Sequence, residues 1–94
     1  MSLEFAWDAK KAKENLSNHD CVSFEEGMTV FADPLAKIFK DEDHSYDEQR
    51  EIIIGHSTRE RLLLVSFTSE GTRVRIISAR EATATERRDY EENT

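Results

Sequence analysis

The sequence predicts a single α+β domain in which a small antiparallel β-sheet carries two N-terminal helices on one face and is followed by a C-terminal helix. Apolar or alternating runs at residues 51–55, 61–68 and 72–80 follow one another closely, which is typical of consecutive hairpins. Ser/Thr-x-x-Glu sequences starting at Ser23 and Thr83 mark two helix starts. The 94 residues suffice for one domain, 1–94, and not for two.

The first half predicts a short strand at residues 5–7 and a helix over residues 9–18 capped by Asp8. The apolar face of that helix is thin and comprises Ala9, Ala12 and Leu16. A second helix starts at the Ser23 capping box and ends at Asp33-Pro34, because proline disfavours a helical residue before it. Residues 36–40 then form a strand, and an acidic loop spans residues 41–48.

The second half predicts the centre of the sheet. Residues 51–55 and 61–68 are almost continuously apolar, which indicates strands covered on both faces. Gly71 supplies the left-handed residue that the next turn requires. In the helix opened by the Thr83 capping box, Tyr90 is the only large apolar residue. That helix therefore packs through Tyr90 and the stems of Arg87 and Arg88, or is completed by a partner.

The alternating strand 72–80 is the most suggestive element for function. Strict alternation places Arg73 and Arg75 with Ile77 on one face, and Val74, Ile76 and Ser78 on the other. Guanidinium groups bind phosphate oxygens in a bidentate geometry. The strand is therefore either part of an anion-binding surface or a half-exposed strand whose arginines pair with nearby carboxylates.

Charge and composition narrow the classes of function. The net charge of −7 argues against a protein that coats nucleic acid. All five lysines lie at or before Lys40 and all eight arginines at or after Arg50, so the second half can form a locally positive face. A single cysteine excludes a disulfide within the chain, and no apolar run is long enough to span a bilayer. We expect a soluble protein of the cytoplasm that does not contact the membrane.

The usual enzyme signatures, such as a phosphate-binding glycine loop or a paired-cysteine zinc site, are missing from the sequence. His44 and Glu48 lie four residues apart in the acidic loop. A histidine among carboxylates suits proton transfer, while the loop's carboxylates also suit a divalent cation or a merely solvated surface. Metal-free RNA cleavage needs proton-transfer groups and cations near the phosphate. Those residue types are supplied by His44, Glu48, Arg61, Arg73, Arg75, Arg80 and Tyr90.

The order and spacing of several motifs resemble one known family. The opening pattern includes Phe5, Trp7, Asp8, Lys11, Asn15, His19 and Phe24-Glu25-Glu26. It continues with Phe31-x-Asp33-Pro34, Asp41-x-x-His44-Ser45-x-x-Glu48-x-Arg50 and Ile54-Gly55-x-Ser57. The closing segment has Arg75-Ile76-Ile77-Ser78-Ala79-Arg80-x-Ala82-Thr83 and Glu86-Arg87-x-x-Tyr90-Glu91. From about Phe5 to Glu91 the chain resembles the BrnT family of bacterial type II toxins.

The resemblance implies a RelE-like fold and a metal-independent endoribonuclease that needs no cofactor and inhibits translation. It also implies a BrnA-like antitoxin with a ribbon-helix-helix DNA-binding domain, a complex of two toxins with two antitoxins, and DNA contact only through the antitoxin. The alternative is a non-catalytic module that binds the antitoxin and helps repress its own operon. We expect catalytic roles for His44, Glu48, Arg61, Arg75 and Arg80, RNA binding by Lys11, Lys13, Arg73 and Ser78, partner binding by Arg87 and Tyr90, and no metal ligands.

Overall fold

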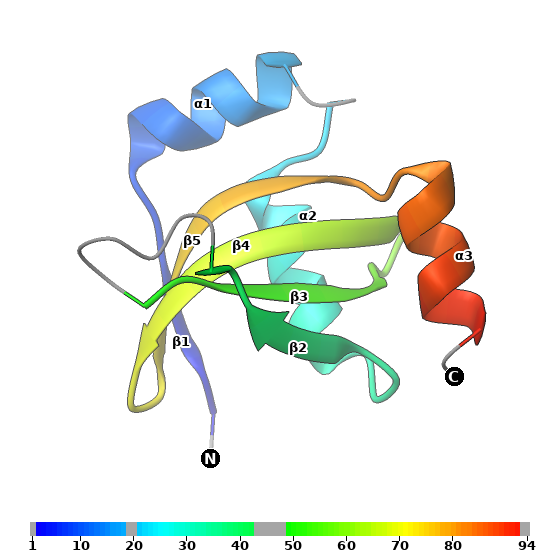
Figure 1. Cartoon of the computed structure of the whole chain (residues 1–94). Coiled ribbons are helices and arrows are strands. Elements are labelled where there is room, and N and C mark those ends of the chain that lie inside the picture. The colour runs from blue at the N-terminus through cyan, green and yellow to red at the C-terminus, as the bar shows by residue number, and fades with distance from the viewer. Residues whose placement is uncertain (1, 19–20, 43–48, 93–94) are drawn as a thin grey trace.

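The computed structural model describes residues 2–18, 21–42 and 49–92. It is an α+β domain with a five-stranded sheet, as predicted (Figure 1). The elements in chain order are β1 (Glu4–Ala6), α1 (Ala9–Asn18), α2 (Phe24–Thr29), a 3₁₀ turn (Val30–Ala32), β2 (Lys37–Lys40), β3 (Glu51–His56), β4 (Leu62–Glu70), β5 (Arg73–Glu81) and α3 (Ala84–Glu92). None of the helices in these ranges is long and apolar enough to cross a membrane.

The sheet is mixed rather than purely antiparallel. Its strand order is β1-β5-β4-β3-β2, and β2 through β5 pair antiparallel as the hairpin pattern predicts. The first strand adds to the outer edge of β5 in parallel, with Glu4 opposite Arg73 and Ala6 opposite Arg75. Because β1 has only three residues, its sequence shows too short an apolar pattern to indicate which strand it pairs with. The parallel edge was therefore not predicted. Gly71 has a φ of 62° in the β4–β5 turn, as the turn chemistry requires.

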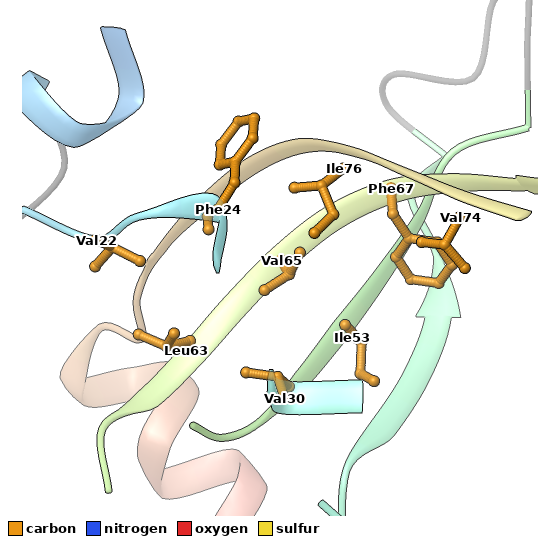
Figure 2. Close-up of a cluster of buried hydrophobic side chains, with 10 residues drawn as sticks. Val22, Phe24, Val30, Ile53, Leu63, Val65, Phe67, Val74 and Ile76 are labelled. Atoms are coloured by element: carbon orange, nitrogen blue, oxygen red, sulfur yellow. The ribbon is translucent and has the colours of Figure 1, made fainter. Parts of the chain in front are cut away.

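One face of the sheet carries the main hydrophobic core. Figure 2 shows side chains from β3, β4 and β5 meeting those of Val22, Phe24 and Val30 from the α2 region. The strand residues of this core are Ile53, Leu63, Val65, Phe67, Val74, Ile76 and Ala79. The helix approaches closely because Gly27 has no side chain: a Cβ there would lie 3.1 Å from the Cβ of Ala79. Figure 1 shows α2 behind the sheet and α3 at the end where β4 starts and β5 finishes.

Helix α1 docks in a different way from the one its sequence predicts. Leu16, assigned above to the apolar face, is 44% exposed, whereas Asn15 is only 5% exposed. The Asn15 side-chain amide donates to the carbonyls of Val22 and Ala79, both at 2.8 Å, and its oxygen accepts from the Ala79 backbone amide at 3.1 Å. A polar residue therefore holds α1 against the part of β5 beyond β1, because the backbone groups of Ala79 there require hydrogen-bond partners.

Strand β5 contains a β-bulge that changes which residues share a face. Ser66 pairs with Ser78 and Phe67 with Ile76, so β5 advances two residues where β4 advances one, and Ile77 is the extra residue. Directly opposed residues share a face of the sheet. Ser78 therefore lies with Ser66 on the face away from α2, and the prediction that it shares a face with Val74 and Ile76 is wrong.

The C-terminal helix begins with the predicted capping box. The Thr83 backbone amide donates to Glu86 Oε1 at 2.9 Å, and the Glu86 amide donates to Thr83 Oγ1 at 3.2 Å. Tyr90 is 5% exposed and packs with Ile54 and Leu62 in a second, smaller cluster. The helix is thus docked within the chain through Tyr90, as in one of the two arrangements considered, while Arg87 and Arg88, which that arrangement also included, are exposed.

Candidate functional site

The bulge at Ile77 aligns the polar residues of β5 on the sheet face opposite α2. Arg73 and Arg75 pair with Glu70 and Thr68 of β4. Beyond the bulge, Ser78 pairs with Ser66 and Arg80 with Leu64. Without the extra residue, Arg80 would share a face with Val74 and Ile76 instead. We call the surface formed by Arg73, Arg75, Ser78 and Arg80 the arginine face.

A hollow of about 570 Å³ lies at the Arg75 end of this face. Arg75 is half-buried and lines the hollow with the exposed Arg73. Gln49, Thr68 and Glu70 supply further polar groups to its wall. Two guanidinium groups and neutral hydrogen-bonding side chains around one hollow suit an anionic ligand, with Glu70 as the opposing charge.

At the other end of the face, Arg80 is held by Glu86. Its Nη1 and Nη2 donate to Glu86 Oε1 and Oε2 at 2.8 and 2.9 Å, and Nη1 also donates to the Glu81 carbonyl at 3.1 Å. The Arg80 hydrogen bonds lower the pKa of Glu86 to about 2, and the same bonds raise the pKa of Arg80. Within the described residues these contacts use three of the five guanidinium N–H groups, leaving Nε–H and one Nη2–H for a ligand.

A second hollow, of about 350 Å³, lies beside Arg80 between α3 and the sheet. We call it the Tyr90 pocket. Its lining is mainly apolar, and four charged side chains also contribute to it. The lining residues are Lys37 and Phe39 of β2, Ile52 and Ile54 of β3, Leu64 of β4, Arg80 of β5, and Glu86, Asp89 and Tyr90 of α3.

Tyr90 is positioned by three neighbours. Its hydroxyl donates to the Leu35 carbonyl at 3.3 Å, its ring meets the His56 ring edge-on with 5.7 Å between centroids, and Lys37 Nζ lies 5.7 Å from the ring centroid. Burial, together with the nearby Asp33 carboxylate, raises the pKa of Tyr90, so the phenol stays protonated at neutral pH. Tyr90 was assigned to partner binding, and in this structure most of its surface contacts its own chain. Arg87, assigned the same role, is exposed on α3.

Arg61 lies in a separate ion-pair network. Its Nε donates to Glu26 Oε2 at 3.0 Å, its Nη2 bonds to Glu26 Oε1, and its Nη1 donates to Glu81 Oε1 at 3.0 Å. Ser57 Oγ donates to Glu26 Oε2 at 2.7 Å. The Arg61 hydrogen bonds hold the pKa of Glu26 below its usual value despite its burial. Arg61 lines neither of the hollows described above, and its position favours a structural role linking α2, β4 and β5.

The remaining predicted residues are distributed as follows. His44 and Glu48 lie outside the described residues. Lys11 and Lys13 are exposed on α1, and Lys11 lines a shallow recess with Asn18, Ile77 and Ser78 at the outer edge of β5. Neither lysine lines the hollows that contain Arg75 and Arg80. Among described residues no three His, Cys, Asp or Glu side chains are arranged to hold a metal ion, but most of the acidic loop lies outside this set.

Sequence reasoning did not select His56, which lies next to Tyr90. Its backbone amide donates to Asp33 Oδ2 at 2.7 Å, and its Nδ1 is 3.8 Å from the same oxygen. Burial of Asp33 by itself raises its pKa, but hydrogen bonds from the amides of His56 and Leu35 outweigh it and leave the pKa below its usual value. The only sequence signal for this residue was a histidine directly after a continuous apolar strand.

Comparisons with known proteins agree with this architecture. The crystal structure of the Brucella abortus ribonuclease toxin BrnT matches with a TM-score of 0.65 and 22% sequence identity, covering 87% of this chain and 99% of that one. At that identity the likeness establishes the fold. No curated protein sequence matches the chain. The family model for the ribonuclease toxin BrnT of type II toxin-antitoxin systems matches residues 7–86. Because that match spans most of the chain, the protein belongs to the BrnT family of ribonuclease toxins.

Proposed function

We propose that the chain cleaves RNA on the arginine face without a metal ion. The observation that carries this proposal is the bulge at Ile77, which aligns Arg75, Ser78 and Arg80 on one face of the sheet. These three residues belong to the closing motif, residues 75–83, which is one of those that carry the resemblance to ribonuclease toxins. A row of guanidinium and hydroxyl groups suits the backbone of single-stranded RNA, whose phosphates accept hydrogen bonds from both.

The proposed reaction is an intramolecular transfer within the RNA. A base removes the proton of a ribose 2′-hydroxyl, whose oxygen attacks the adjacent phosphorus. The bond from phosphorus to the 5′-oxygen breaks as an acid protonates that oxygen. The products are a 2′,3′-cyclic phosphate and a 5′-hydroxyl, with no added reactant. Arg75 and Arg80 stabilise the charge that develops on the phosphate oxygens, since donors already in place act most strongly there.

His44 and Glu48 remain our candidates for proton transfer, by resemblance. Arg73 and Ser78 are proposed to bind the RNA backbone beside Arg75. Lys11 lies on α1 beside the outer edge of β5, and Lys13 is exposed on the same helix. Both are proposed to contact RNA that leaves the face past Ser78. Arg61 is not part of the proposed active site, because its three guanidinium nitrogens already bond to Glu26 and Glu81.

Membership of a type II toxin-antitoxin family implies that this toxin has an antitoxin partner. We propose a BrnA-like ribbon-helix-helix antitoxin in a complex of two toxins and two antitoxins, through which alone the toxin is brought to DNA. The net charge of −7 supports a partner whose contact surface is mainly basic. The exposed Arg87 on α3 supports some acidic groups on that surface as well. An RNA substrate and a DNA-bound partner imply that the pair acts in the cytoplasm.

The test compares wild type, Arg75→Ala and Arg88→Ala on total RNA with a chelator present. Arg88 is exposed on α3 and has no part in the proposed site, so its variant controls for the loss of one surface arginine. We expect cleavage by wild type and Arg88→Ala, with cyclic phosphate ends, and a loss of at least about 100-fold for Arg75→Ala. Equal cleavage by all three would remove Arg75 from the site. No cleavage by folded wild type would favour the non-catalytic co-repressor module.

A further inference from the structure

The Tyr90 pocket has features that phosphate binding alone does not require. Its floor consists of Ile52, Ile54 and Leu64, and Phe39 is 49% exposed although it lies on a strand with its ring against the pocket. The volume of about 350 Å³ lies within the range of sites that enclose small organic groups. A mainly apolar pocket of this size, lined by the aromatic side chains of Phe39 and Tyr90, fits a flat heterocycle.

The pocket is continuous with the arginine face. Arg80 belongs to both, and Leu64 of the pocket floor is the β4 residue that pairs with Arg80. Thr68, which pairs with Arg75, is four residues further along β4, about 13 Å away at 3.3 Å per residue. Figure 1 shows β5 running from beside β1 to the end of the sheet at α3. A short single strand of RNA with its backbone along β5 can therefore reach from Arg75 to the pocket.

We propose that the Tyr90 pocket binds one nucleobase of the RNA substrate, unstacked from its neighbours and inserted between Phe39 and Tyr90. This inference rests on the proposed function and adds a specificity subsite to it. Single-stranded RNA is commonly recognised in this way, with a base against aromatic side chains and its polar edge read by hydrogen bonds. The remaining N–H groups of Arg80 then face the phosphate attached to that nucleotide.

The carboxylates that line the pocket determine which bases fit. Glu86 and Asp89 place carboxylates beside the apolar floor, and carboxylates accept hydrogen bonds but cannot donate them when ionised. The pKa of Glu86 is about 2, because Arg80 and Thr83 donate hydrogen bonds to it, so it stays ionised at neutral pH. A base with an exocyclic amino group, such as guanine, adenine or cytosine, meets these acceptors with a donor. Uracil has no exocyclic amino group and offers only its N3–H between two carbonyl oxygens, which meet the carboxylates unfavourably, so we expect it to be disfavoured.

The chain offers a matched pair of variants for the test. Ile38 and Phe39 are neighbours on the edge strand β2, 55% and 49% exposed, and successive strand residues point to opposite faces. Phe39→Ala removes a pocket wall, while Ile38→Ala removes a similarly exposed apolar side chain from the other face. Both variants should keep the wild-type unfolding midpoint, because neither side chain is buried.

The experiment measures kcat/KM on single-stranded oligonucleotides that carry A, C, G or U at each position around one cleavage site. We expect wild type and Ile38→Ala to discriminate against uracil at one position, and Phe39→Ala to lose on the order of tenfold in kcat/KM, mainly through KM, together with that discrimination. Equal behaviour of Phe39→Ala and Ile38→Ala would overturn the base pocket while leaving the nuclease function intact.

Two further outcomes separate this inference from the proposed function. If wild type cleaves no oligonucleotide, the equilibrium affinity of wild type, Ile38→Ala and Phe39→Ala for the same RNAs still tests whether the pocket binds a base. Equal affinity of the three proteins for every RNA would overturn the base pocket. If Phe39→Ala cleaves RNA like wild type but loses the antitoxin while Ile38→Ala retains it, the pocket receives a protein side chain and the base assignment is wrong.

Discussion

Arg80 of β5 and Glu86 of α3 form a bidentate ion pair, with distances of 2.8 and 2.9 Å between their nitrogens and oxygens. Glu86 also closes the capping box with Thr83, so one carboxylate starts the helix and fixes it to the sheet. Since Tyr90 is the only large apolar anchor of α3, this pair contributes much of the docking. The same pair orients Arg80 towards the Tyr90 pocket.

Replacing Glu86 with Gln should lower the free energy of unfolding by about 1–2 kcal/mol at pH 7, after allowing for solvent screening of a partly exposed pair. The pKa of Glu86 falls from 4.5 to about 2 on folding, so the unfolded chain binds more protons between these values. The contribution is therefore present above about pH 4.5 and is lost as the pH falls towards 2. Urea unfolding across this range measures it.

Glu92→Gln serves as the control for that series, because Glu92 is exposed on the same helix. An acid-induced loss of stability of equal size in both variants would contradict a specific role for the Arg80–Glu86 pair.

Glu26→Gln should destabilise the protein by about 3 kcal/mol, because it removes one partner of a buried ion pair and leaves Arg61 partly uncompensated. Glu26 is 5% exposed and bonds to both Arg61 and Ser57. The control is Glu25→Gln at the exposed neighbouring position of α2, for which we expect a change of less than about 0.5 kcal/mol. Thermal unfolding and RNA cleavage should be measured on the same samples.

If Arg61 is structural, cleavage by Glu26→Gln should follow the folded fraction and be normal well below the unfolding midpoint. A fully folded Glu26→Gln variant with strongly reduced cleavage would return Arg61 to the list of catalytic candidates.

Asn15→Ala should cost about 2–3 kcal/mol, because it leaves buried backbone groups of Ala79 and Val22 without their partner. Amide hydrogen exchange at Ala79 should accelerate more than the global change explains, since the Ala79 N–H bonds directly to Asn15. Asn18→Ala, at an exposed position of the same helix, is the comparison. Similar unfolding curves for the two variants would mean that the Asn15 contacts contribute little.

Glu60→Gly should raise the free energy of unfolding by up to about 1 kcal/mol, because Glu60 has a φ of 62° in the β3–β4 turn and a side chain is strained there. Glu60→Ala keeps the Cβ and removes only the carboxylate, so it should give no such gain. A stabilisation of the same size in both variants would attribute the effect to charge rather than to backbone strain. Chemical denaturation at pH 7 distinguishes the two.

Local chemistry was sufficient to predict much of the fold. The capping box at Thr83 forms hydrogen bonds in both directions between residues three apart. At Ser23 only the predicted bond from the Glu26 amide to the Ser23 hydroxyl forms, and the Glu26 carboxylate bonds to Ser57 and Arg61 instead. The continuous apolar runs of β3 and β4 predicted buried central strands, and Ile53, Leu63 and Val65 are indeed in the core. The order of the motifs likewise sufficed to predict the BrnT family, which the family match confirms.

Contacts between distant segments decided the rest. Whether Ser78 and Arg80 lie on the face of Arg75 depends on an extra residue in β5 relative to β4, which a single strand's alternation cannot reveal. Asn15 is buried because it bonds to Ala79, which is 64 residues away in the sequence. Arg61 is held in an ion pair because it meets Glu26, which is 35 residues away. Neither contact can be predicted from neighbouring residues. The sequence by itself determined the helices and strands, because these depend on residues close together in the chain. It also determined the family, because the order and spacing of the motifs are properties of the sequence. Tertiary structure alone decided which side chains meet, because register, bulges and long-range ion pairs are properties of two segments at once.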